Sequence, residues 1–283
     1  MTKEDALKFM SVVTSAFSRA SAHIMEVYGR NFTVTYKEDA SPVTEADRGA
    51  NKIITEQLSV AYPSYAILAE ETAESEADRQ ARLANPDCFL VDPLDGTKEF
   101  IAHIDQFSIN IALSHCHKIS AGAVFSPTEN LLYYAVRGLG AYRTQTDGKN
   151  LSVFFSEKER IHVSDRTDRL VAMVSRSHID EKTQWLLDSA KDKISRVVSA
   201  GSALKGCRIA AGEADIYYRM GNTMEWDTAA NQVIVEEAGG EMRQLDAERS
   251  PFLYNRENSL NANGFYILNR PENDLVPRDF TIA

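Results

Sequence analysis

The feature that most constrains this chain is a short apolar run that leads directly into two carboxylates. Residues 88–91 are apolar and predict a buried strand, and the sequence DPLDGT follows at positions 92–97. Pro93 fixes φ and Gly96 tolerates positive φ, so the backbone can fold back and bring both carboxylates close to a main-chain carbonyl. Such a group of oxygen donors suits a hard divalent cation. We therefore expect a metal site where this strand ends.

Further acidic residues occupy comparable positions, at predicted helix starts or strand ends. They are Asp47, Glu70, Glu71 and Asp227. Asp47 falls in the first turn of a helix that Thr44 is expected to cap, and the two glutamates follow a predicted strand at residues 65–69. Asp227 is the expected N-cap of a helix at residues 228–238.

The spacing leaves two interpretations of these acids open. If they converge, they surround cations, because gathering so many carboxylates without counterions costs several kcal/mol. Oxygen-only ligands select Mg²⁺, Mn²⁺ or Ca²⁺ over zinc, and paired Mg²⁺ ions suit in-line phosphoryl displacement. If the acids do not converge, Asp47 only complements a helix dipole and the Glu70-Glu71 pair belongs to the solvated surface.

The first half of the chain predicts helices followed by a meander of antiparallel strands. Helical spacing of apolar residues predicts an N-terminal helix that ends at Gly29. Residues 72–87 are polar and charged and predict a flap or mobile loop. Strands separated by turn residues are expected at residues 107–113, 119–125, 131–136 and 141–143, the first of them half-buried.

The second half alternates strands with helices and predicts an α/β unit. The expected elements are strands at residues 170–174, 196–198 and 214–218 and helices at 180–190, 202–211 and 228–238. A polar stretch at residues 144–168 separates the two patterns. We therefore expect a metal-binding half at residues 1–160 and a substrate-recognition half at residues 161–283.

Composition limits the partners of the protein. The chain has 41 acidic and 31 basic residues and a formal net charge of −10. Such a surface repels polyanions, which argues against binding of a nucleic-acid polymer. A small anionic substrate remains compatible where metal ions neutralise the acids locally.

Cysteine content and hydropathy indicate a cytoplasmic protein. No apolar run approaches the roughly 18 residues of a transmembrane helix, and the acidic N-terminus is unlike a signal peptide. Peripheral contact with the cytoplasmic face of the inner membrane stays open. Cys88, Cys116 and Cys207 are odd in number and widely spaced, so we expect reduced core thiols.

Together the motifs resemble the inositol monophosphatase superfamily. They are PVTEAD at positions 42–47, EE at 70–71, DPLDGT at 92–97 and WDTAA at 226–230. Matches at positions 92–101, 175–178, 201–205 and 226–230 are most similar to the CysQ-type 3′(2′),5′-bisphosphate nucleotidases. The resemblance covers nearly the whole chain. It implies a layered α/β/α/β/α sandwich, of the inositol monophosphatase and sugar phosphatase type, with the site between the two halves.

The resemblance also implies a two-metal mechanism. The implied Mg²⁺ ligands are Glu70, Asp92, the carbonyl of Leu94, Asp95 and Asp227, with Glu71 near a weaker third ion. Asp92 would bridge the two principal ions. The nucleophilic water would be oriented by Thr97 with Glu70 or Asp47 as its acidic partner, without a phosphoenzyme. Inhibition by Li⁺, which displaces a magnesium ion, is a further implied property.

The implied substrate is a small bisphosphate nucleotide. Its implied contacts are Glu70, Leu94, Asp95, Gly96, Thr97, Ser175, Arg176, His178, Ser202, Lys205, Arg219 and Asp227. The main chain of Gly96 and Thr97 would bind one phosphate. The basic residues among these contacts are few in a chain that is otherwise acidic, and they would bind the second phosphate. The implied reaction converts adenosine 3′,5′-bisphosphate to AMP and phosphate, which clears a by-product of sulfate assimilation.

The chain departs from its relatives at three positions, and other functions remain open. Relatives commonly carry serine at Ala203, proline at Asn222 and glycine at Asn231. An inositol monophosphatase or related sugar phosphatase would use the same metals but different substrate contacts. A haloacid-dehalogenase-like phosphatase would place its two acids at i and i+2 rather than at i and i+3. A catalytically silent metal-binding regulator is the third alternative.

Overall fold

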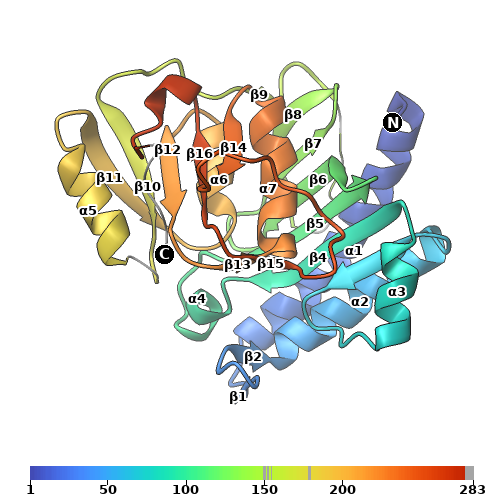
Figure 1. The fold of residues 1–283 in the computed structure, drawn as a ribbon. Coiled ribbons are helices and arrows are strands. Elements are labelled where there is room, and N and C mark those ends of the chain that lie inside the picture. The colour runs from blue at the N-terminus through green and yellow to red at the C-terminus, as the bar shows by residue number, and fades with distance from the viewer. Residues whose placement is uncertain (149–150, 152, 154, 178–179, 278–283) are drawn as a thin grey trace.

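Helices and sheets stack in five layers, in the order helix, sheet, helix, sheet, helix (Figure 1). The structure is a computed structural model, and it describes residues 1–148, 151, 153, 155–177 and 180–277. The layered α/β sandwich expected from the sequence is thus confirmed.

Two long helices form the first outer layer. They are α1 (Lys3–Tyr28) and α2 (Glu45–Ala61), and each begins at a threonine whose side chain closes a capping box. The apolar face of α1 packs on the seven-stranded sheet, where Phe9 stacks on Phe89 with ring centroids 6.2 Å apart. Helix α1 ends at Gly29 as predicted, although Gly29 has a φ of −79° and ends the helix without a left-handed residue.

The seven-stranded sheet forms the second layer and follows chain order from β3 to β9. Its strands are β3 (Ala66–Ala69), β4 (Asp87–Asp95), β5 (Ser108–His115), β6 (Lys118–Ser126), β7 (Leu131–Val136), β8 (Gly140–Gln145) and β9 (Arg160–Ile161). Strand β3 is parallel to β4, and every later pair is antiparallel. The predicted meander is therefore confirmed.

The five-stranded sheet forms the fourth layer. Its strands, in spatial order, are β11 (Ile194–Ala200), β10 (Leu170–Ser175), β12 (Ile216–Arg219), β16 (Phe265–Leu268) and β14 (Glu241–Gln244). The first three are parallel, and β16 and β14 pair in antiparallel fashion. Helix α5 (Glu181–Ser189) covers its outer face, where Leu186 joins a buried apolar cluster.

Two helices fill the middle layer between the sheets. They are α6 (Leu204–Ala210) and α7 (Glu225–Glu237), and their apolar residues form one buried cluster with both sheets. Helix α7 crosses β6 where Gly122 exposes its backbone. A Cβ atom at Gly122 would lie 2.9 Å from Cα of Ala230, so only glycine lets the helix approach this closely. The proposed division at residue 160 remains a prediction.

Short elements complete the chain. They are β1 (Val34–Tyr36), β2 (Pro42–Thr44), α3 (Glu76–Leu83), α4 (Thr97–Ile101), β13 (Thr223–Met224), β15 (Leu260–Asn261) and a 3₁₀ turn at Pro271–Asn273. Strand β1 pairs with β2, and β13 pairs with β15.

The prediction of a mobile flap at residues 72–87 is wrong. Helix α3 occupies the centre of this stretch and begins with a capping box between Ser75 and Asp78. Its Arg82 is buried, with the guanidinium 2.6 Å from Glu74 and 2.7 Å from Oδ1 of Asn255. Polar contacts rather than an apolar face anchor the helix, so the sequence carried no apolar periodicity there.

Two finer predictions are also wrong. Strand β5 is buried on both faces, except at its last residue, because helices cover both sides of the sheet. Helix α7 begins at Glu225, before the expected start, so Asp227 lies in the first turn and is not the N-cap. Its carboxylate still binds the start of the helix, because Oδ2 accepts the N–H of Met224 at 2.7 Å.

The expectation of three core thiols holds for two of them. Cys88 and Cys207 are buried, whereas Cys116 is exposed because it lies in the turn between β5 and β6. Among the described residues, no helix is long and apolar enough to cross a membrane.

Candidate active site

The end of β4 forms the centre of the candidate site. The ladder between β4 and β5 shifts register between Asp92 and Asp95, which lets the backbone fold back there. The N–H of Leu94 donates to Oδ1 of Asp92 at 3.0 Å and fixes that carboxylate. Gly96 follows with φ of +95°, and a Cβ atom there would lie 3.1 Å from the carbonyl oxygen of Gln106. The turn therefore requires glycine, as the sequence indicated.

A hydroxyl and a carboxylate meet beside this turn. Thr97 Oγ1 donates to Oδ1 of Asp47 at 2.9 Å and lies 3.2 Å from the carbonyl oxygen of Leu94. The other carboxylate oxygen of Asp47 accepts the N–H and the hydroxyl of Thr44 at 2.7 and 2.6 Å. Burial raises the pKa of Asp47, and these hydrogen bonds oppose the rise. Of the two acidic partners expected for Thr97, the structure places Asp47 in direct contact.

The two glutamates after β3 face a lysine from the β1–β2 hairpin. Nζ of Lys37 lies 2.9 Å from Oε1 of Glu70 and also pairs with Glu71. Burial opposes the positive charge, but the two carboxylates raise the pKa of Lys37 above its ordinary value. Burial raises the pKa of Glu70 although Lys37 lowers it. Sequence reasoning missed Lys37, which lies in a polar loop and belongs to no motif.

Four acids, two at the end of β4, one after β3 and one in α7, repel one another here. Burial raises the pKa of Asp92 well above its ordinary value, and Glu70, Asp95 and Asp227 raise it further. Burial, followed by repulsion from Asp95, raises the pKa of Asp227 to about 8. Burial also raises the pKa of Asp95, which Lys205 and Asn110 oppose. The four acids therefore lie close enough to affect one another's ionisation. Asp47 is buried and bonded to Thr97, so the interpretation in which it only complements a helix dipole is wrong.

The donor set fits a hard divalent cation. Its atoms are the carboxylate oxygens of Glu70, Asp92, Asp95 and Asp227 and the carbonyl oxygen of Leu94, with neither sulfur nor imidazole among them. A bound cation would relieve the repulsion that raises these pKa values. Within the described residues, no three acidic, histidine or cysteine side chains already stand at ligand spacing. Side-chain adjustment would accompany metal binding, and release of Glu70 from Lys37 is part of it.

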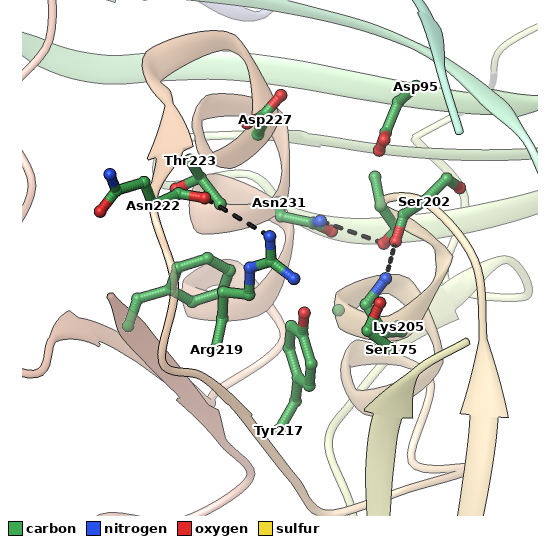
Figure 2. A pocket seen from close by; sticks show the side chains of 13 residues that line it. Asp95, Ser175, Ser202, Lys205, Tyr217, Arg219, Asn222, Thr223, Asp227 and Asn231 are labelled. Atoms are coloured by element: carbon green, nitrogen blue, oxygen red, sulfur yellow. Dashed lines mark hydrogen bonds between the residues drawn. The ribbon is translucent and has the colours of Figure 1, made fainter. Parts of the chain in front are cut away.

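A cavity of about 200 Å³ opens beside these acids. Figure 2 shows Asp95 and Asp227 at one end of it and Lys205, Tyr217 and Arg219 at the other. The lining residues come from strands β4, β10, β12, β13 and β16, helices α6 and α7 and nearby loops: Asp95, Ser175, Ser202, Ala203, Lys205, Gly206, Tyr217, Arg219, Asn222, Thr223, Asp227, Asn231 and Phe265. The cavity thus joins an acidic end to a basic end.

The basic end is partly buried and incompletely paired, with Lys205 buried and Arg219 half-buried. Lys205 Nζ donates to the carbonyl oxygen of Ser202 at 2.5 Å and lies 5.3 Å from the centre of the Tyr217 ring. Burial lowers the pKa of Lys205 to about 8, and Asp95 opposes the fall. Nε of Arg219 is buried without a hydrogen-bond partner in the described part of the chain. Another of its nitrogens lies 3.5 Å from the carbonyl oxygen of Asn222.

The structure separates the members of the SRSH motif. Ser175 lies at the end of β10 and lines the cavity. Arg176 is exposed outside the cavity, and its Nε donates to Oε1 of Gln106 at 2.9 Å. The prediction for His178 falls outside the described residues.

Three positions where the chain departs from its relatives all line this cavity. They are Ala203, Asn222 and Asn231. Asn231 Nδ2 donates to the carbonyl oxygen of Ala203 at 3.0 Å, so two of the departures contact each other. Tyr217, Thr223 and Phe265 were not expected in the site, because apolar and small strand residues carry no motif.

The five-layer fold agrees with comparison to known proteins. The chain belongs to the inositol monophosphatase family, whose model matches residues 5–276. Members of this family are generally magnesium-dependent phosphatases.

Within this family, the chain is similar in sequence to proteins named 3′(2′),5′-bisphosphate nucleotidase CysQ. The chain is 34% identical over 247 residues to the 3′(2′),5′-bisphosphate nucleotidase CysQ of Aggregatibacter actinomycetemcomitans, covering 87% of each chain. It is 36% identical over 247 residues to CysQ of Salmonella typhimurium, covering 86% of this chain and 93% of the relative.

Solved structures of proteins from the same family resemble this chain. CysQ from Bacteroides thetaiotaomicron superposes with a TM-score of 0.79 at 33% identity, over 93% of this chain and 98% of that one. An inositol monophosphatase from Thermotoga maritima has a TM-score of 0.73 at 26% identity, over 94% and 92% of the two chains.

Proposed function

We propose that the protein is a Mg²⁺-dependent 3′(2′),5′-bisphosphate nucleotidase that converts adenosine 3′,5′-bisphosphate to AMP and phosphate. The observation that carries the proposal is the cavity with acids at one end and Lys205 and Arg219 at the other. A bisphosphate needs both ends, since one phosphate is hydrolysed and the other is only bound. The names of the CysQ relatives support the same substrate class.

The ligands would divide between two ion positions, and Asp92 would be shared by both. Glu70, Asp92 and the carbonyl oxygen of Leu94 would hold the first Mg²⁺, and Asp92, Asp95 and Asp227 the second. When bound, Mg²⁺ activates a water and neutralises charge on the phosphate that is transferred. Glu71 would serve a weaker third ion in place of its pairing with Lys37. We also propose that Li⁺ competes with Mg²⁺ for one of these positions.

The protein's own part in the chemistry centres on Thr97. Because its hydroxyl hydrogen points to Asp47, its lone pairs face away and can accept a hydrogen bond from the attacking water. As the water attacks phosphorus, the bond from phosphorus to the 3′-oxygen breaks, the water proton moves to Thr97 Oγ1 and the threonine proton moves to Oδ1 of Asp47. The departing 3′-oxygen takes a proton from solvent, and Asp47 later returns its proton to solvent. The raised pKa of Asp47 favours acceptance of that proton. The N–H groups of Gly96 and Thr97 orient the phosphate.

The remaining phosphate would meet the basic end. Arg219 has an unpartnered buried Nε, and Lys205 is fixed beside Tyr217. With a pKa lowered to about 8, Lys205 is mostly protonated at neutral pH and carries the charge that a phosphate requires. Ser175 and Ser202 add hydroxyl groups to the same wall.

The test is phosphate release from adenosine 3′,5′-bisphosphate and from inositol 1-phosphate, measured side by side with Mg²⁺ and then with added Li⁺. We expect a strong preference for the bisphosphate and loss of turnover with lithium. Preference for inositol 1-phosphate would retain the metal site and overturn the role of Lys205 and Arg219. Absence of turnover with both substrates would leave a metal-binding regulator as the function.

A further inference from the structure

A second group of reactive side chains lies at the opposite end of β4 from the candidate active site. It is formed by Asp87, His115 and Cys116, at the start of β4 and in the turn between β5 and β6. Nδ1 of His115 lies 2.8 Å from Oδ1 of Asp87, and its Nε2 lies 3.5 Å from Sγ of Cys116. The imidazole thus stands between a carboxylate and a thiol.

The contact with Asp87 determines how His115 meets the sulfur. An ionised carboxylate can accept hydrogen bonds but cannot donate them. The neutral imidazole of His115 therefore carries its proton on Nδ1, which faces Asp87. Nε2 then presents a lone pair to Cys116, which is the arrangement in which a histidine withdraws a proton from a thiol. The proton acceptor and the nucleophile are adjacent in the chain, and Asp87 holds the acceptor in place.

The turn that carries Cys116 is held rigidly. Cys116 and His117 both have positive φ, at +48° and +64°, as the two central residues of a tight hairpin turn require. The N–H of Cys116 donates to the carbonyl oxygen of Pro86 at 2.8 Å. The carbonyl oxygen of His117 accepts the N–H of Tyr254 at 3.0 Å, and its Nδ1 lies 2.7 Å from the carbonyl oxygen of Tyr254. Neither position carries the asparagine or glycine that adopts such φ at least cost.

A cavity of about 520 Å³ lies against the same group, and Asp87 and His115 line it. Tyr62 and Tyr65 form an aromatic wall with ring centroids 5.1 Å apart. Lys8 reaches over the Tyr62 ring at 5.3 Å. The cavity is separate from the one beside Asp95 and shares no residue with it. Its lining next to the imidazole is aromatic, with Lys8, Asp5 and Asp87 as the charged groups.

We propose that Cys116 is a nucleophilic thiol that exchanges with low-molecular-weight disulfides, with the adjacent cavity holding the part of the molecule that becomes attached. His115 Nε2 takes the thiol proton, and the Cys116 thiolate attacks one sulfur of the disulfide. The new S–S bond forms as the old one breaks, and the displaced sulfur leaves as a thiolate that is protonated in water. The protein sulfur is oxidised by the disulfide that is reduced, so no further reactant is needed.

The first test follows reaction of the folded, metal-loaded protein with excess oxidised glutathione at about pH 7, by intact-mass spectrometry and peptide mapping. We expect one glutathionyl group per chain, on Cys116, and none in Cys116→Ser. The buried Cys88 and Cys207 serve as internal controls within the same molecule. Attachment at either of them, or no attachment, would overturn the proposal.

The second test separates chemical activation from mere exposure. His115→Gln should slow the reaction about tenfold, because the acceptor for the thiol proton is lost. The matched variant His103→Asn replaces a histidine with positive φ outside this cluster and leaves His115 in place, so it should react as the native protein does. Equal rates for His115→Gln and the native protein, with unchanged unfolding temperatures, would show that Cys116 reacts only because it is exposed.

Discussion

The acidic and basic ends of the main cavity are built in different ways. Each of three acids is bound by a main-chain N–H two or three residues away in the chain: Asp92 by Leu94, Asp47 by Thr44, and Asp227 by Met224. At the basic end, Arg219 keeps a buried donor without a partner in the described residues. The acids are therefore preorganised by local backbone contacts, whereas the basic end retains donors for a ligand. Chemistry and substrate choice should respond separately to mutation.

The largest effect should come from the acidic end. Asp95→Asn removes a proposed metal ligand and should lower turnover of every phosphate substrate about a thousandfold, with the fold retained. The measurements are kcat at saturating Mg²⁺ and the unfolding temperature. The exposed Asp168→Asn is the matched control and should retain full activity. Near-native turnover in Asp95→Asn would disprove the two-metal assignment.

Removal of the proposed proton relay should have the next largest effect. Thr97→Val keeps the size of the side chain but cannot accept the water proton, so kcat should fall about a hundredfold. Thr97→Ser keeps the hydroxyl and should recover most of the rate. The Mg²⁺ concentration that gives half-maximal activity should change little in either variant. A large rise in that concentration with an unaltered kcat would instead make Thr97 a metal-binding residue.

The basic end should affect only substrates with two phosphates. Arg219→Gln should lower kcat/KM for adenosine 3′,5′-bisphosphate about tenfold, since a hydrogen bond to a charged group is lost. Hydrolysis of adenosine 3′-monophosphate should be nearly unchanged in the same variant. Equal losses for both substrates would contradict the separation of the two ends.

The smallest effect concerns the pH dependence of stability without metal. The folded state raises the pKa of Asp92, Asp95 and Asp227, the last to about 8, so it holds more protons than the unfolded chain. The metal-free protein should therefore lose stability as pH rises from about 4 to about 8. Mg²⁺ binds the ionised acids, so it should raise the unfolding temperature by about 5 °C more at pH 8 than at pH 5.5. Equal shifts at both pH values would argue against a cluster of repelling carboxylates.

Local motifs explain which parts of the site were predictable from the sequence. Thr44 was the expected cap of a helix with Asp47 in its first turn, and the structure confirms both. The turn at Gly96 was predictable because proline and glycine restrict the backbone in known ways. In both cases neighbours in the chain determine the geometry.

Contacts between distant residues explain what the sequence did not predict. Lys37 reaches Glu70 and Glu71 from a separate hairpin, and no local pattern marks it. Helix α3 is held by Arg82, whose partner Asn255 lies 173 residues away. The double-sided burial of β5 depends on helices from both halves of the chain. Such features follow from packing, which one sequence does not display.

The close approach of α7 to Gly122 has a consequence for the width of the cavity. Ala230, which touches Gly122, lies three residues after Asp227, about 4.5 Å along the helix axis. Helix α7 packs between the two sheets. Its distance from the seven-stranded sheet therefore sets the distance between Asp227 on α7 and Asp95 on β4. A single methyl group at position 122, on a strand without any proposed ligand, would push α7 away from β6 and increase the distance between the proposed ligands Asp227 and Asp95.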